Sequence, residues 1–200
     1  MQREICSGRN RKESSTAGFR SKKYIAKSLN QRGCEVTVYP AHTTAEEIIS
    51  SNPDGIMLSN GPGDPADCTS IIEEIKKIVQ YRYSDLCNLP WTSAHGSCYR
   101  CDYTQVKNTD IAVEIIRSKD LQTNRVYISS QNHGYVVDAE NVDPNVAVPA
   151  FTNVNDGTNE GLAYVGKNIF TVQFHPEACP GPQDSGYLFD RFIEMMGGAK

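Results

Sequence analysis

Strand-like and helix-like segments alternate along the first half of the chain, and this alternation restricts the fold more than any other feature. Residues 22–33 carry apolar side chains at helical spacing and end on Gly33, a residue suited to a left-handed helix cap. Residues 34–40 then alternate between β-branched and polar side chains, and residues 55–58 form an apolar run. Strands that alternate with helices favour a parallel sheet with right-handed crossovers. We therefore expect an α/β fold, a doubly wound and mostly parallel sheet flanked by helices.

Two further helices are indicated by apolar spacing and by capping residues. Residues 69–83 have isoleucine and valine at helical spacing, and residues 42–50 form a shorter helix with Thr43 and Glu46 at capping-box spacing. Residues 184–198 combine an apolar face with Asp184 as an expected N-cap. This last helix is predicted to dock on the sheet at the end of the chain.

The second half of the chain has short strand patterns separated by turn residues. These patterns are typical of antiparallel hairpins, which we expect to be added to the parallel sheet. They lie at residues 125–130, 134–138, 145–152, 160–165 and 168–174.

The chain length and the apolar content predict one main domain. Two hundred residues with 38% hydrophobic content can fill one core. Residues 1–18 are an atypical polar N-terminal segment, and residues 19–200 form the expected domain. Within it, residues 91–118 fit the strand and helix pattern badly, apart from the strand-like run at 111–116. They are predicted to be a divergent region.

Charge, apolar content and cysteine content restrict the expected partners, the location and the state of the thiols. The net charge is −4 and there is no long basic run, so the sequence predicts neither a nucleic-acid partner nor a membrane surface. The polar N-terminus and the lack of a long apolar stretch predict a cytoplasmic protein. Seven cysteines without framework spacing predict reduced thiols.

A glycine-rich turn follows the apolar run at 55–58. Gly61 and Gly63 flank Pro62, so bare backbone N–H groups at this turn could donate to a developing oxyanion. A simple tight turn is the alternative interpretation.

A histidine and a carboxylate close the last strand pattern. His175 and Glu177 lie two residues apart, hence on one side of an extended chain. This spacing suits a base held by an orienting carboxylate, although a structural histidine would fit the same pattern.

Two other stretches carry groups with chemistry. Residues 132–134 could bind a polar ligand through amide and backbone groups, or could form a turn. His95, Cys98 and Cys101 offer metal-ligating atoms, but the C-x-x-C spacing lacks a clear second pair, so no metal site is expected.

Taken together, several stretches closely resemble the class I glutamine amidotransferase domain of the carbamoyl-phosphate synthase small subunit. The resemblance covers residues 19–90 and 119–196. The stretches that carry it are residues 29–40, 52–65, 130–138, 155–162 and 173–196.

The resemblance implies hydrolysis of L-glutamine by a Cys-His-Glu triad, without a cofactor. The ammonia would serve carbamoyl phosphate synthesis on a large synthetase subunit. His175 would be the base and Glu177 its partner, while Gly61 and Gly63 would donate to the acyl oxygen. Contacts to the glutamine α-amino and carboxylate groups would come from Asn132, Gly134 and Tyr135.

The nucleophile of this family does not transfer directly onto the chain. The family pattern G-x-C-x-G-x-Q follows a Leu-Pro pair, and counting from Leu89 puts His95 at the place of the cysteine. Cys98 lies three positions later and is our candidate nucleophile. A catalytically inactive homologue kept for its fold or for partner binding, and a metal-binding module at His95, Cys98 and Cys101, are the alternatives.

Overall fold

The computed structural model describes nine stretches of the chain, and all structural statements below concern these stretches. They are residues 4–9, 20–40, 42–59, 69–80, 86–88, 103–105, 114–131, 135–177 and 184–197.

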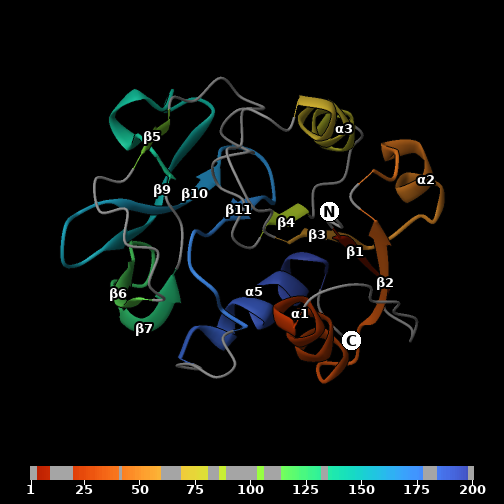
Figure 1. The fold of residues 1–200 in the computed structure, drawn as a ribbon, viewed down its shortest axis with the longest axis horizontal. Helices are drawn as coiled ribbons and strands as arrows, with labels where there is room; N and C mark the ends of the chain where they lie inside the picture. The colour runs from red at the N-terminus through yellow and green to blue at the C-terminus, as the bar shows by residue number, and fades with distance from the viewer. Residues whose placement is uncertain are drawn as a thin grey trace.

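A nine-stranded sheet runs through the molecule (Figure 1). Its strands, in spatial order, are β2 (Glu35–Pro40), β1 (Glu4–Arg9), β3 (Gly55–Leu58), β4 (Leu86–Asn88), β11 (Phe170–Thr171), β10 (Asn159–Tyr164), β9 (Ala147–Asn153), β6 (Glu114–Asp120) and β7 (Val126–Gln131). A separate two-stranded sheet pairs β5 (Tyr103–Gln105) with β8 (Tyr135–Val137).

The prediction of a mostly parallel sheet is wrong for most strand pairs. Among the described strands, only β3 with β4 and β4 with β11 pair in parallel. β1 lies between β2 and β3 but is antiparallel to both. The prediction failed here because alternation of strands and helices along the sequence does not fix the direction of each strand. The segments 121–125, 154–158 and 165–169 are too short for a crossover, so the pairs β6–β7, β9–β10 and β10–β11 are antiparallel, as the predicted hairpins require. The pair β6–β9 is antiparallel as well.

Helices cover both faces of the sheet, as the doubly wound prediction requires. Figure 1 shows α2 (Ala45–Ser50) and α3 (Thr69–Gln80) on one side, and α1 (Arg20–Asn30) and α5 (Tyr187–Met195) on the other. Side chains that alternate along β3 meet different helices: Ile56 and Leu58 belong to the core under α2 and α3, while Met57 belongs to the core under α1 and α5. A strand buried on both faces explains the uninterrupted apolar run at 55–58.

Local sequence signals predicted the end of α1 correctly but not the start of α5. Gly33 has φ +86°, the left-handed conformation that its position after α1 predicted. The N-terminus of α5 differs from the prediction, because Asp184 lies in the 3₁₀ turn η3 (Asp184–Gly186) and Gly186 is the N-cap. The other short 3₁₀ turn, η2 (Ala139–Asn141), follows β8.

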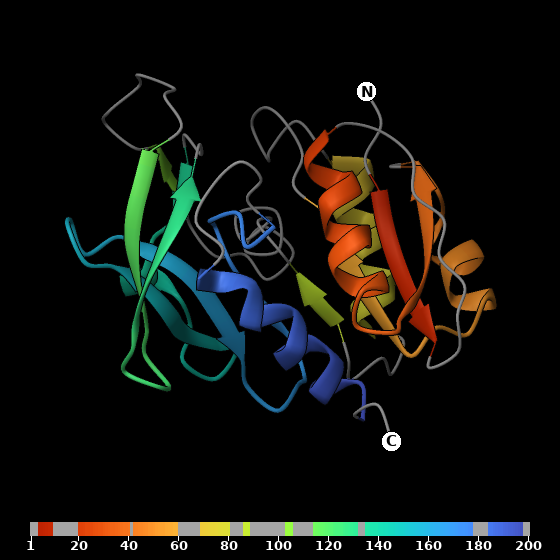
Figure 2. The ribbon, with the colours of Figure 1, turned by 90° about the horizontal axis from the view of Figure 1, so that it is seen from below.

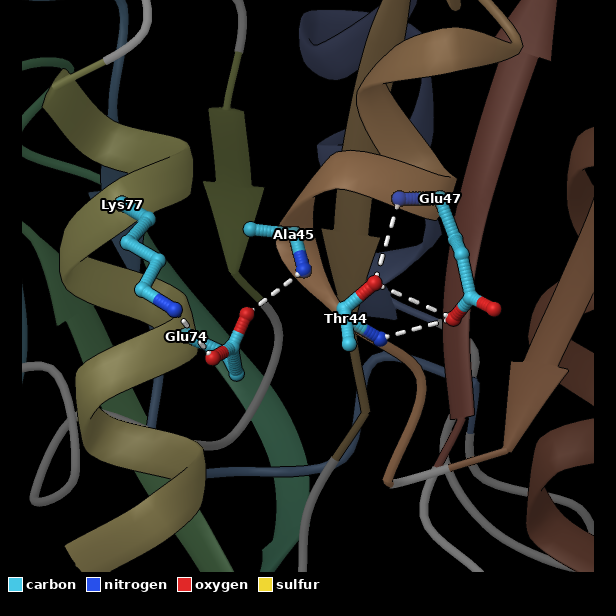
Figure 3. Close-up of polar contacts among 5 residues, drawn as sticks. All are labelled: Thr44, Ala45, Glu47, Glu74 and Lys77. Atoms are coloured by element: carbon cyan, nitrogen blue, oxygen red, sulfur yellow. Dashed lines mark hydrogen bonds and ion pairs between the residues drawn. The ribbon is translucent and has the colours of Figure 1, made fainter.

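A capping box starts α2 one residue later than predicted. Thr44, not Thr43, is the N-cap: its Oγ1 accepts from Glu47 N at 3.3 Å, and its own N donates to Glu47 Oε2 at 3.0 Å. Figure 3 shows a third acceptor, because Glu74 of α3 reaches across and its Oε2 accepts from Ala45 N at 2.7 Å. This contact joins α2 to α3 at the observed N-cap and satisfies one of the N–H groups at the start of α2.

Replacing Glu74 by alanine should lower the free energy of unfolding at pH 7 by about 0.5 to 1 kcal/mol. The Ala45 N–H, and then the Lys77 ammonium, lower the pKa of the Glu74 carboxyl. A lowered folded-state pKa means that this stabilisation is full above the ordinary carboxyl range, near pH 4.3, and is lost as the pH falls through the folded-state value. Urea titrations of both proteins from pH 7 to pH 3 should show the two stabilities converging. A constant difference at every pH would contradict a role for the charge.

No helix in the described stretches has the length and apolar character needed to span a membrane.

Candidate functional site

The segment that carries the predicted base leaves the middle of the sheet. β11 ends at Thr171, earlier than the predicted strand at 168–174, and the chain then bends and turns through residues 172–177. Phe174 is buried and packs edge-on against Phe151 of β9, with 5.6 Å between ring centroids. This packing holds the bent segment against the core immediately before His175.

The imidazole of His175 contacts the carboxylate of Glu177. His175 Nδ1 lies 3.1 Å from Glu177 Oε1. The His175 side chain is 14% exposed and the Glu177 side chain is 1% exposed, so the imidazole reaches solvent and its partner does not. The two side chains meet although the chain between them is bent, because a two-residue separation also brings side chains together in a turn.

This geometry determines what the imidazole can do. When Glu177 accepts a hydrogen bond from Nδ1–H, the proton of the neutral ring is on Nδ1 and Nε2 carries the lone pair. Within the described residues, Glu177 Oε2 is buried without a hydrogen-bond partner. The Glu177 carboxylate therefore orients the ring and selects this tautomer. The pair can therefore act as an oriented general base.

The backbone of His175 is held by a strand that is distant in the sequence. His175 N donates to the carbonyl oxygen of Ser130, in β7, at 2.8 Å. Two residues earlier, Gln173 N donates to the Glu160 carbonyl oxygen of β10, also at 2.8 Å. No sequence pattern pointed to Ser130, because a backbone carbonyl has no residue-type signature and the partner lies 45 positions away.

Most of the other predicted site residues lie outside the described stretches. Tyr135 begins β8, where its backbone pairs with Gln105. The structure therefore brings together His175 and Glu177 and leaves the remaining assignments as predictions. The predicted residues outside the described stretches are Gly61, Gly63, His95, Cys98, Cys101, Asn132 and Gly134.

In the part of the chain that the structure describes, there is no cluster of three or more histidine, cysteine, aspartate or glutamate side chains that could hold a metal ion. The alternative metal site at His95, Cys98 and Cys101 falls outside that part.

Comparisons with known proteins show which family the sequence matches. Residues 17–86 and 95–195 match the family model of class I glutamine amidotransferases. The small chain of carbamoyl phosphate synthase from Symbiobacterium thermophilum is 40% identical over 186 residues, which cover 89% of this chain and 49% of that protein. The corresponding small chain from Staphylococcus haemolyticus is 43% identical over 182 residues, covering 89% of this chain and 48% of that one. The chain thus spans about half the length of these relatives.

A solved structure extends the likeness to the fold. A Thermoplasma acidophilum protein described as one subunit of a GMP synthase superposes with a TM-score of 0.77 at 14% identity, covering 94% of both chains. At this identity the likeness concerns the fold alone. The family match includes the segment that joins His175 to Glu177, and the sheet with helices on both faces agrees with it. The chain therefore belongs to the class I glutamine amidotransferase family.

Proposed function

We propose that this chain is the glutaminase domain of a carbamoyl phosphate synthase small chain, with L-glutamine as its substrate. The observation that carries the proposal is the contact of His175 Nδ1 with the buried Glu177 carboxylate, within a chain of this family. Similarity to carbamoyl phosphate synthase small chains over 89% of the sequence supports this particular branch of the family.

The proposed reaction begins with a cysteine thiolate that attacks the side-chain amide carbon of glutamine. His175 takes the thiol proton on Nε2 and then gives it to the leaving nitrogen, so that ammonia departs and a glutamyl thioester remains. His175 next takes a proton from water, which attacks the thioester carbon and releases glutamate while the thiol is restored. Glu177 stabilises the imidazolium at both stages.

The remaining residues of the proposed site, apart from Cys98, are assigned by resemblance. The backbone N–H groups at Gly61 and Gly63 donate to the oxyanion of the tetrahedral intermediate. Cys98, which lies three positions after the place of the family cysteine, is not given by the resemblance and is our candidate for the sulfur. Asn132, Gly134 and Tyr135 contact the α-amino and carboxylate groups of glutamine.

The partner in this proposal is a large synthetase subunit that consumes the ammonia. The chain spans about half the length of each small-chain relative, so the proposal concerns the contact made by this half. Purified chain should accordingly bind a carbamoyl phosphate synthase large subunit in a pull-down assay, and failure to bind would contradict this partner.

A thiol-labelling experiment tests the nucleophile. A chloroketone analogue of glutamine should alkylate Cys98, glutamine should protect it, and peptide mass mapping should find little label on Cys34. Cys34 is a matched control because burial raises the pKa of its thiol, which lowers the thiolate fraction that reacts.

The outcomes of this experiment separate the alternative hypotheses. Protected labelling at another cysteine would contradict the assignment of Cys98. A chain that is neither labelled nor able to release ammonia from glutamine, yet binds the synthetase, would be an inactive homologue retained for partner binding.

A further inference from the structure

The strand that holds the His175 backbone, β7, is an edge strand of the nine-stranded sheet. β6 pairs with β9 only over Ser118, Lys119 and Asp120, whereas Ser130 lies opposite Ile115 at the other end of the hairpin. Ser130 therefore lies on a part of the β6–β7 hairpin where β7 pairs with β6 and β6 no longer pairs with β9. The position of Ser130 therefore depends on how the hairpin is held near its 121–125 turn.

The first turn of α5 lies beside the β6–β7 hairpin (Figure 2), and its contacts are with residues near the 121–125 turn. Tyr187, the first residue of α5, donates from its hydroxyl to Asp120 Oδ2 at 2.9 Å. Its ring stacks on the ring of Tyr127, with 4.4 Å between centroids and 25° between planes. One side chain thus contacts both strands of the hairpin, β6 through Asp120 and β7 through Tyr127.

Asp120 is a buried carboxylate, and both of its oxygens accept hydrogen bonds. Its side chain is 1% exposed. Oδ1 accepts from the N–H groups of Gln122 and Thr123, at 2.8 and 3.1 Å, and so fixes the turn that follows β6. Burial, and then the Asp120 charge, raise the pKa of Tyr187, so its hydroxyl stays protonated and donates over the physiological range.

The same helix also contacts the strand that leads to His175. Arg191, one turn after Tyr187, places its guanidinium over the ring of Phe170 in β11, 4.7 Å from the centroid. Arg191 Nη1 is also 4.0 Å from Asp120 Oδ2. The two segments that support His175, the hairpin through Ser130 and β11 through the main chain, are therefore held to one another by neighbouring turns of α5.

We infer that Tyr187 is a positioning residue for His175: by fixing Asp120 and Tyr127 it holds the hairpin so that the Ser130 carbonyl accepts from the His175 N–H. The inference rests on the proposed role of His175 as a base. Tyr187 itself contacts no reacting atom in this assignment and acts through the hairpin.

Hydrogen exchange at single amides tests this role without requiring turnover. Tyr187→Phe keeps the stacked ring and removes the hydroxyl, which leaves Asp120 Oδ2 with Arg191 alone among the contacts given above. The exchange rate of the His175 amide should rise about tenfold, while that of the buried Met57 on β3 stays unchanged. Where glutaminase activity is measured, kcat should fall and KM should stay the same.

Asp190→Asn is the matched control on the same helix. Asp190 forms an ion pair with Arg32, which follows α1. Asp190→Asn therefore weakens a contact of α5 that does not involve the hairpin or Asp120. The inference is overturned if Tyr187→Phe leaves His175 exchange unchanged, or if Asp190→Asn raises it equally. Increased exchange in a chain that does not hydrolyse glutamine would support the positioning of His175 and count against the proposed function alone.

Discussion

Replacing His175 by asparagine should lower kcat for glutamine hydrolysis by about 10² to 10⁴-fold, the usual contribution of a positioned general base. Asparagine keeps a polar side chain of similar reach but cannot accept the thiol proton and return it to the leaving nitrogen. Ammonia release, followed by a coupled glutamate dehydrogenase assay, measures the effect. The binding of glutamine should change much less, because the base is not assigned to contacts with the α-amino or carboxylate groups.

Two companion variants make this result specific. Glu177→Gln keeps an oxygen near His175 Nδ1 but removes the negative charge, so kcat should fall by less than in His175→Asn. His42→Asn changes an exposed histidine in the loop before α2 and should retain full activity. Wild-type kcat in His175→Asn would remove His175 from the mechanism.

Replacing Gly161 by alanine should lower the free energy of unfolding by about 3 kcal/mol, at the upper end of the usual cost of overpacking. A Cβ at this position would lie 2.1 Å from the backbone oxygen of Thr171 and 2.8 Å from Phe151 Cδ2. β10 approaches β11 closely here, beside the register shift at Gly161, and Leu162 N donates to Thr171 Oγ1 at 3.2 Å. Relief of the clash would have to move β11, four residues before His175. Chemical denaturation measures the loss.

Gly55→Ala is the matched control for crowding. Its Cβ would meet Met196 Sδ at 2.4 Å and Phe192 Cζ at 3.0 Å. Met196 lies at the end of α5 and is a flexible side chain that can move away, whereas the Thr171 carbonyl is part of a paired strand. The expected loss is therefore below about 1 kcal/mol. An equal loss in both variants would show that the close approach at Gly161 is not special.

Local signals in the sequence predicted the helices but not all of their exact ends, and they did not predict the strands β1, β4 and β5. The periodicity at 69–83 anticipated α3, and the C-terminal pattern anticipated α5. The N-cap of α2 was misplaced by one residue, because Thr43 and Thr44 both precede a glutamate by three positions. Glu74 contacts the N–H of Ala45, and this contact from another helix accompanies the choice of Thr44.

For the site, the sequence singled out His175 and Glu177 because a base and its carboxylate lie two residues apart. It could not single out Ser130, which contacts the His175 backbone, or Asp120 and Tyr187, which contact each other, since both contacts depend on which surfaces pack together.

The sequence by itself determined the helices α1, α2, α3 and α5, where α1 ends at Gly33, and that His175 and Glu177 are close. These features depend on residues within a turn or two of one another. Only the tertiary structure decided that β1 runs against its neighbours and that β7 carries the carbonyl that holds His175. Strand direction and contacts between distant segments depend on how whole faces of the sheet and helices are buried against one another. Many residues across the fold contribute to this burial, so no single sequence position predicts it.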